Sequence, residues 1–215
     1  MGAALALQGL LRLVPAPPGG ALAEVLPALS FFSLVGPAWW AAQRRGHDPL
    51  RAHGLLVPLR GLPLALLVTG GVLLAFVGGA ALLAGLQGLA PRTPPWQDAG
   101  LRFVADALFV ALPEEWLFRG VLQPALDRPE GPRRRVLGAP LGRGALLAAL
   151  LFGLAHALLW LAPARLLTAG PGLLFGWVRA RTGGVLPAVL VHAACNATLE
   201  LVQGTWPRLE LPGVG

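Results

Sequence analysis

Long apolar runs without charge constrain this sequence more than any other feature. Runs of ~18 to 30 residues rich in Leu, Ala, Val and Gly recur between charged residues, and each could cross a ~30 Å hydrocarbon core as a helix. The chain is 55% hydrophobic and only 13% charged, whereas about a quarter of the residues of a soluble globular domain are charged. The sequence therefore predicts a polytopic membrane protein.

The apolar runs predict an all-α transmembrane bundle of about six spans. The expected spans are 23–42, 62–86, 101–122, 144–161, 166–180 and 185–202. Residues 1–20 lack a basic start and end in a Pro-rich stretch, so we expect an interfacial segment instead of a cleaved signal peptide. The prolines within 91–95 separate an N-terminal part, 1–95, from a C-terminal part, 96–215, which holds four spans.

The basic residues follow the pattern of loop charges that orient membrane helices. All seventeen are Arg. Loops on one side hold eleven: Arg44, Arg45, Arg51, Arg60, Arg128, Arg133, Arg134, Arg135, Arg143, Arg179 and Arg181. The other side holds Arg12, Arg92, Arg102, Arg165 and Arg208, and Arg119 lies within a span. This asymmetry places both termini outside and the 133–135 loop in the cytoplasm. Nucleic-acid binding is the weaker explanation, and the compositional bias favours a bacterial cytoplasmic membrane.

The third predicted span carries two carboxylates and a guanidinium, Glu114, Glu115 and Arg119. A charge near the centre of a bilayer costs ~2.5 to 3.5 kcal/mol even on the lenient insertion scale, so these residues imply partners and a function. Because Glu115 and Arg119 are four positions apart, they stack on one helix face. Glu114 is rotated by about 100° and is left without that partner. A self-neutralising charge ladder at a helix end is the purely structural alternative.

Polar residues also recur at four-residue spacing in two later spans. Phe152 and His156 share one face of the fourth span, and His192 and Asn196 share one face of the sixth. A lone membrane histidine is more often an interhelical hydrogen-bond donor than a catalytic group. Together, however, Glu, His and Asn side chains can polarise a water molecule and donate hydrogen bonds to an oxyanion. This combination is what an amide hydrolase requires.

Taken together, the three motifs resemble the CPBP family of intramembrane proteases, the CAAX-protease, bacteriocin-processing and Abi-like group that includes the type II CAAX prenyl proteases. The matching residues are Glu114, Glu115 and Arg119 in Glu-Glu-x-x-x-Arg, Phe152 and His156 in Phe-x-x-x-His, and His192 and Asn196 in His-x-x-x-Asn. The resemblance covers about 101–202 and places the catalytic core in the four C-terminal spans. The first two spans match only in being hydrophobic.

The resemblance implies an intramembrane endopeptidase. In it, Glu114 would act as general base on a water shared with His156, while His192 and Asn196 would hold the oxyanion. Glu115 and Arg119 would be the orienting pair. The implied partners are a peptide or membrane-anchored protein substrate and the lipid bilayer, without nucleic acid. The predicted topology puts Glu114 in the cytoplasmic half of its span, so we expect access from that side.

Three alternatives remain open on the sequence. Glu114, His156 and His192 could ligate zinc, but the His-Glu-x-x-His signature is absent and Asn is an uncommon zinc ligand, so no cofactor is favoured. A membrane immunity or binding protein without enzymatic activity is the second alternative. The third is a transporter or proton relay, which predicts inverted repeats that the sequence does not show. The single Cys195 excludes an intrachain disulfide.

Overall fold

The chain is mostly helical, as the sequence predicts. The computed structural model describes residues 33, 35–56, 60–94, 99–127 and 131–210. The expected interfacial segment and most of the first expected span therefore lie outside the described residues. The described helices are 35–44, α3 (Pro49–Ala52), α4 (Leu62–Leu86), a composite run over 99–126, α8 (Arg143–Leu159), η3 (Pro163–Thr168), α9 (Ala169–Thr182) and α10 (Val185–Thr205).

The composite run carries the charged motif and is not a regular α-helix. It consists of α5 (Ala99–Asp106), the π-helical η1 (Ala107–Ala111), α6 (Leu112–Glu115), the π-helical η2 (Trp116–Leu122) and α7 (Gln123–Leu126). Pro113 follows η1 and has no N–H to donate to the carbonyl four residues earlier, which favours a wider turn there. Wide turns of this kind occur frequently at functional sites. The α-helical spacing used on the sequence did not predict them.

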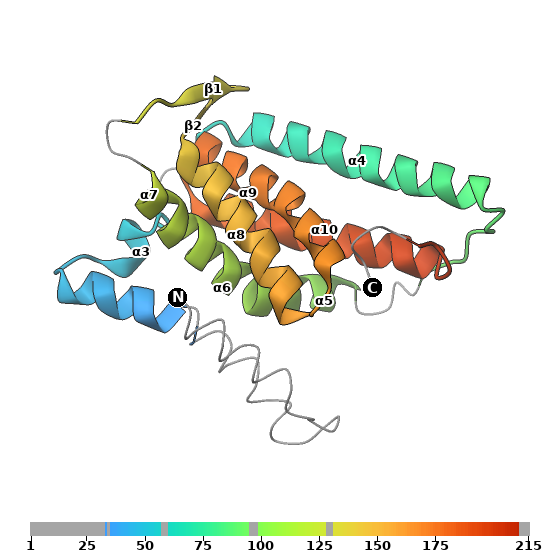
Figure 1. Ribbon diagram of the computed structural model, residues 1–215, viewed down its shortest axis with the longest axis horizontal. Helices are drawn as coiled ribbons and strands as arrows, with labels where there is room; N and C mark the ends of the chain where they lie inside the picture. The colour runs from blue at the N-terminus through green and yellow to red at the C-terminus, as the bar shows by residue number, and fades with distance from the viewer. Residues whose placement is uncertain (1–32, 34, 57–59, 95–98, 128–130, 211–215) are drawn as a thin grey trace, which may run out of the picture.

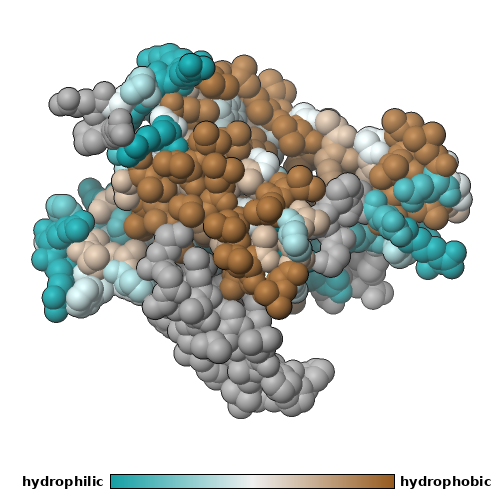
Figure 2. All heavy atoms as spheres, viewed as in Figure 1, coloured by the Kyte–Doolittle hydropathy of each residue, from teal (hydrophilic) through white to brown (hydrophobic). Residues whose placement is uncertain are grey.

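Helix α4 lies along the outside of the bundle (Figure 1). Its inner face is made of small residues, with Ala65, Ala80 and Ala84 buried. Its outer face exposes leucines, including Leu67 at 72% and Leu74 at 75%. Small residues let helices approach closely in a membrane, and the leucines match lipid tails. An apolar surface also covers α8 in the middle of the molecule, with polar residues gathered toward the two ends (Figure 2).

Two described helices, α4 and α10, are long and apolar enough to cross a membrane by length and composition. Helix α8 is apolar but shorter. The expected span 166–180 is a 3₁₀ turn, η3, followed by α9. Pro171 lies in the first turn of α9, where its missing N–H costs no helical hydrogen bond. The count of six spans therefore stays a prediction.

The expectation of an all-α fold was incomplete, because the loop before α8 contains a β-hairpin. Strand β1 (Arg134–Val136) pairs antiparallel with β2 (Ala139–Leu141), and Val136 stands opposite Ala139. The turn residues Leu137 and Gly138 have φ angles of 46° and 80°. Two successive positive φ angles are the requirement of a type I′ turn. Leucine is rare in that role, so no hairpin was predicted from these residues.

Close packing of α8 against η3 and the start of α9 fixes the position of His156. A Cβ atom on Gly153 would lie 2.7 Å from the Leu166 carbonyl oxygen and 2.9 Å from the Ala169 Cβ atom. The first neighbour is a backbone atom and the second is a Cβ atom at the start of α9, so neither can yield without moving backbone. Gly153 is one helical turn from His156, and the contact fixes where that imidazole lies.

We therefore expect Gly153→Ala to destabilise the fold by about 1 to 3 kcal/mol, because the added methyl group overpacks the interface. The matched control is Gly170→Ala in α9, where nothing lies within 4 Å of the added atom and alanine favours the helix. Thermal unfolding of both variants in detergent measures the difference. Equal midpoints for the two variants would contradict the packing argument.

Candidate active site

Glu115 is the centre of a fully buried ionic cluster. Its Oε2 atom lies 3.2 Å from Nε of Arg119, and its Oε1 atom lies 3.0 Å from Nδ1 of His192. The side chains of Glu115 and Arg119 are 0% exposed, and that of His192 is 5% exposed. The predicted stacking of Glu115 and Arg119 on one face is present. His192 comes from α10, so the cluster joins two separate helices.

Arg119 extends the cluster to a third helix. Its Nη2 atom donates a hydrogen bond of 2.7 Å to the Gly172 carbonyl in α9. The guanidinium carbon lies 4.8 Å from the ring centroid of Phe152 and 5.5 Å from that of Phe175. Aromatic faces attract a cation that has lost its water. Arg119 is therefore held by an acid, a carbonyl and aromatic rings, which is how a guanidinium is tolerated in an apolar interior.

Glu114 and His156 form a second, more accessible pair. Oε2 of Glu114 lies 3.9 Å from Nε2 of His156, and the side chains are 13% and 20% exposed. Nδ1 of His156 is 3.0 Å from the Phe152 carbonyl oxygen. Because a carbonyl only accepts, Nδ1 carries the proton and Nε2 of a neutral imidazole is an acceptor facing Glu114. That Glu114 oxygen is buried and makes no hydrogen bond to any described residue.

Phe152 brings the two pairs into one site. Its ring centroid lies 4.3 Å from that of His156 and 5.7 Å from that of His192. The His192 ring stacks on Phe175 at 4.6 Å with an interplanar angle of 16°. Glu114 and Glu115 are adjacent in the chain, and their carboxylates face different histidines.

Asn196 has a partner that the sequence did not predict. Its Nδ2 atom lies 3.1 Å from both carboxylate oxygens of Asp106 in α5. His192, the predicted companion of Asn196, is engaged by Glu115 instead. Asp106 interrupts the same apolar run as Glu114, and an acid within a predicted span was the signal that could have identified it.

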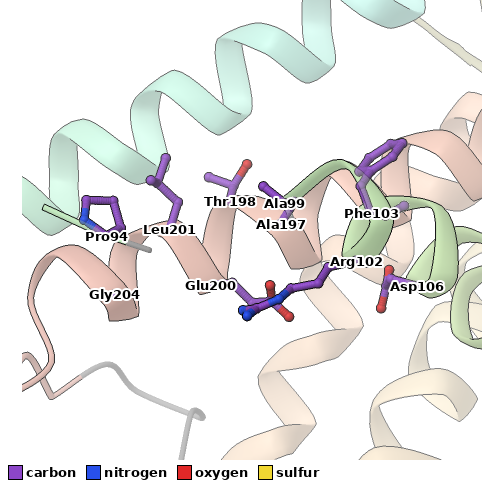
Figure 3. Close-up of a pocket in the computed structure, with 11 residues that line it drawn as sticks. Pro94, Ala99, Arg102, Phe103, Asp106, Ala197, Thr198, Glu200, Leu201 and Gly204 are labelled. Atoms are coloured by element: carbon purple, nitrogen blue, oxygen red, sulfur yellow. The ribbon is translucent and has the colours of Figure 1, made fainter. Parts of the chain in front are cut away.

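A pocket of about 270 Å³ opens beside the Asp106 carboxylate, between α5 and α10 (Figure 3). Phe103 and Leu201 give it apolar walls, while Asp106, Arg102 and Glu200 give it charge. In the close-up, the Arg102 and Glu200 side chains converge from opposite helices. The pocket therefore offers an amphipathic surface next to the residue that holds Asn196.

The three side chains that could ligate zinc, Glu114, His156 and His192, do not face a common point. Among the residues that the structure describes, no three His, Cys, Asp or Glu side chains are grouped so that they could hold a metal ion. Glu114, His156 and His192 are distributed over the two pairs, with His192 Nδ1 directed at Glu115. The described residues thus offer no three-ligand arrangement for zinc.

The N-terminal part of the chain contacts the site through Trp116, the residue after Glu115. Its indole N–H donates a hydrogen bond of 2.9 Å to Nδ1 of His53, and its ring packs 5.8 Å from that of Trp39. The bond requires an unprotonated Nδ1. Burial lowers the pKa of His53 below its ordinary value of 6.5, because a charged imidazole is disfavoured there.

We expect Arg119→Met to cost about 3 to 5 kcal/mol of stability, because it leaves Glu115 buried without its cation. Combining it with Glu115→Gln should recover part of that loss. The matched control is the exposed pair of Arg51 and Asp48, 3.5 Å apart, where Arg51→Met should cost less than about 1 kcal/mol. Unfolding in detergent measures all three variants, and equal losses for the two Arg→Met changes would refute the buried cluster.

The His53 contact predicts a pH-dependent stability. Since the folded state lowers the pKa of His53, the unfolded chain binds its proton more tightly, and this contribution is lost as the pH falls below about 6.5. His53→Gln keeps an acceptor for Trp116 but does not titrate. We expect the fall in unfolding temperature between about pH 8 and about pH 5 to be smaller in His53→Gln than in wild type. An unchanged pH dependence would contradict this role of His53.

Comparison with known proteins supplies the family. No curated protein and no solved structure matches the chain. Residues 96–198 match a family model, and the matched range contains the whole constellation from Asp106 to Asn196. Members of this family are membrane proteins, in agreement with the apolar outer surface of α4. The segment 96–198 belongs to the Rce1-like family of type II CAAX prenyl endopeptidases, within the CPBP group of CAAX proteases.

Proposed function

We propose that this chain is an intramembrane endopeptidase in which Glu114 activates the water that hydrolyses the peptide bond. The observation that carries the proposal is the Glu114 and His156 pair. Two acceptor atoms face each other across 3.9 Å, which is too long for a direct hydrogen bond. A water that donates ~2.8 Å bonds to both would hold them roughly 4 Å apart, so the spacing suits a shared water.

Proton transfer to and from this water then runs through Glu114. Glu114 takes a proton from the water, and the oxygen attacks the carbonyl carbon of the scissile bond to give a tetrahedral intermediate. Collapse of that intermediate breaks the C–N bond, and Glu114 returns the proton to the leaving nitrogen. The Phe152 carbonyl fixes the His156 tautomer, so its Nε2 stays directed at the water.

His192 would stabilise the oxyanion through its second nitrogen. Nδ1 is engaged by the Glu115 carboxylate, so a hydrogen bond to substrate has to come from Nε2. An imidazole donates from both nitrogens only when it is protonated, and Glu115 is the anion that would stabilise the imidazolium. Removing one such donor typically costs ~10² to 10³ in rate. Glu115 and Arg119 thereby support the site and do not touch the substrate.

Asn196 would be the second oxyanion donor, oriented by Asp106. Its Nδ2 atom carries two hydrogens. One N–H directed between the two carboxylate oxygens accounts for both 3.1 Å contacts and leaves the other N–H for the substrate. The pocket next to Asp106 would then receive part of the substrate chain, which is a peptide or a membrane-anchored protein.

The test is cleavage by the purified full chain in detergent and in vesicles. The first probe is a farnesylated peptide that ends in a CAAX sequence, because the family is one of CAAX prenyl endopeptidases. The second is a library of single-span membrane peptides analysed by mass spectrometry. Glu114→Gln and Glu114→Ala should each lower the rate by at least ~10², the usual contribution of a general base. Glu210→Gln, the same change at an exposed acid beyond α10, should retain wild-type activity.

The other outcomes separate the alternatives. Cleavage abolished by a zinc chelator and restored by zinc would replace the glutamate mechanism with the zinc-dependent form. Cleavage that survives both Glu114 substitutions would remove Glu114 from the mechanism. Specific binding of a membrane peptide without cleavage would instead favour an immunity or binding protein, since the buried cluster would still hold the fold together.

A further inference from the structure

We propose that the β-hairpin of β1 and β2 is an interfacial membrane anchor. In this proposal the apolar turn enters the edge of the bilayer, and the arginines before it bind anionic lipid headgroups. The inference is independent of the peptidase chemistry. It rests on the turn itself, on how the hairpin is attached to α9, and on its level relative to the membrane-spanning helices.

The turn exposes apolar side chains at a strained position. Val136 is 45% exposed and Leu137 is 60% exposed. Leu137 also has a φ of 46°, in the left-handed region where a Cβ atom clashes with the backbone. Asn, Asp and Gly are the residues that suit this position in water. Leucine gains nothing there unless the turn lies in an apolar medium.

The hairpin is nevertheless fixed to the bundle and does not project as a free loop. The Trp177 indole N–H donates a 2.8 Å hydrogen bond to the Val136 carbonyl oxygen. Ala139 is completely buried. A Cβ atom on Gly138 would lie 3.3 Å from Nε of Arg181. One edge of the hairpin is therefore packed on α9, and the exposed turn is held at a defined height.

That height corresponds to the edge of the hydrocarbon. The backbone N–H of Arg60 donates a 3.1 Å hydrogen bond to the Thr182 carbonyl, so α4 begins level with the end of α9. Trp177 lies five residues before Thr182, which is about 7 Å along a helix. Segments at a membrane interface are typically buried about 5 to 10 Å into the boundary between headgroups and tails. Figure 1 shows the hairpin beside these two helix ends.

The charge of the hairpin selects anionic lipid as the partner. Arg134 and Arg135 are exposed in β1, directly after the exposed Arg133. Residues 131–141 contain no acid, and Arg60 is exposed at the same end of the molecule. Arginines placed at this level attract the anionic headgroups of the cytoplasmic leaflet. Long side chains can reach those headgroups while the turn remains deeper.

The test places a nitroxide spin label on the full chain in vesicles. Leu137→Cys is made in a Cys195→Ser background, and collision rates with oxygen and with a water-soluble nickel chelate report the surroundings of the label. Leu74→Cys on the exposed face of α4 is the lipid reference, and Asp48→Cys, outside the spans, is the aqueous reference. We expect the label at 137 to favour oxygen over nickel, as the label at 74 does.

The lipid charge is tested in phosphatidylcholine vesicles with and without phosphatidylglycerol. Adding phosphatidylglycerol should lower the nickel accessibility of the label at 137, and Arg134→Gln with Arg135→Gln should remove most of that response. A label at 137 as accessible to nickel as the one at 48 would overturn the anchor and point to a protein partner. An identical response with and without the two arginines would overturn the proposed headgroup contact.

Discussion

The fold depends on satisfying one buried carboxylate. Glu115 is 0% exposed and bonded to groups from two helices, and its partner Arg119 reaches the backbone of a third. Water cannot compensate any of these groups in a membrane. The composite helix, α9 and α10 can therefore pack together only in an arrangement that closes this cluster. The apolar helices supply surface for lipid, while the ionic cluster specifies which faces meet.

The same constraint explains why the two adjacent glutamates differ in exposure and in their partners. Arg119 and His192 both converge on Glu115, so its charge is compensated and it is inaccessible. Glu114 faces only His156 at a distance that leaves room between them. A reactive base needs an open coordination shell, whereas a structural ion needs a closed one. The two roles are separated by one residue because the helix turns them toward different neighbours.

Local spacing predicted much of the site, but not its tertiary partners. The contact between Glu115 and Arg119 follows from four-residue periodicity, and the association of Glu114 with His156 follows from the family resemblance. The bond between Asp106 and Asn196 joins residues 90 positions apart and depends on how α5 packs against α10, which no local pattern records. The hairpin was not predicted because Leu137 stands where a type I′ turn favours Asn, Asp or Gly.

The two π-helical segments have a consequence for the inheritance of this constellation. Each π turn holds one residue more than an α turn, so it takes up the extra residue locally while the helix on both sides keeps its phase. Loss of a single residue from a regular α-helix would instead rotate the residues before it by about 100° relative to those after it. The segments η1 and η2 therefore mark the places where the composite helix can lose a residue without separating Asp106 from Asn196 or Glu115 from His192.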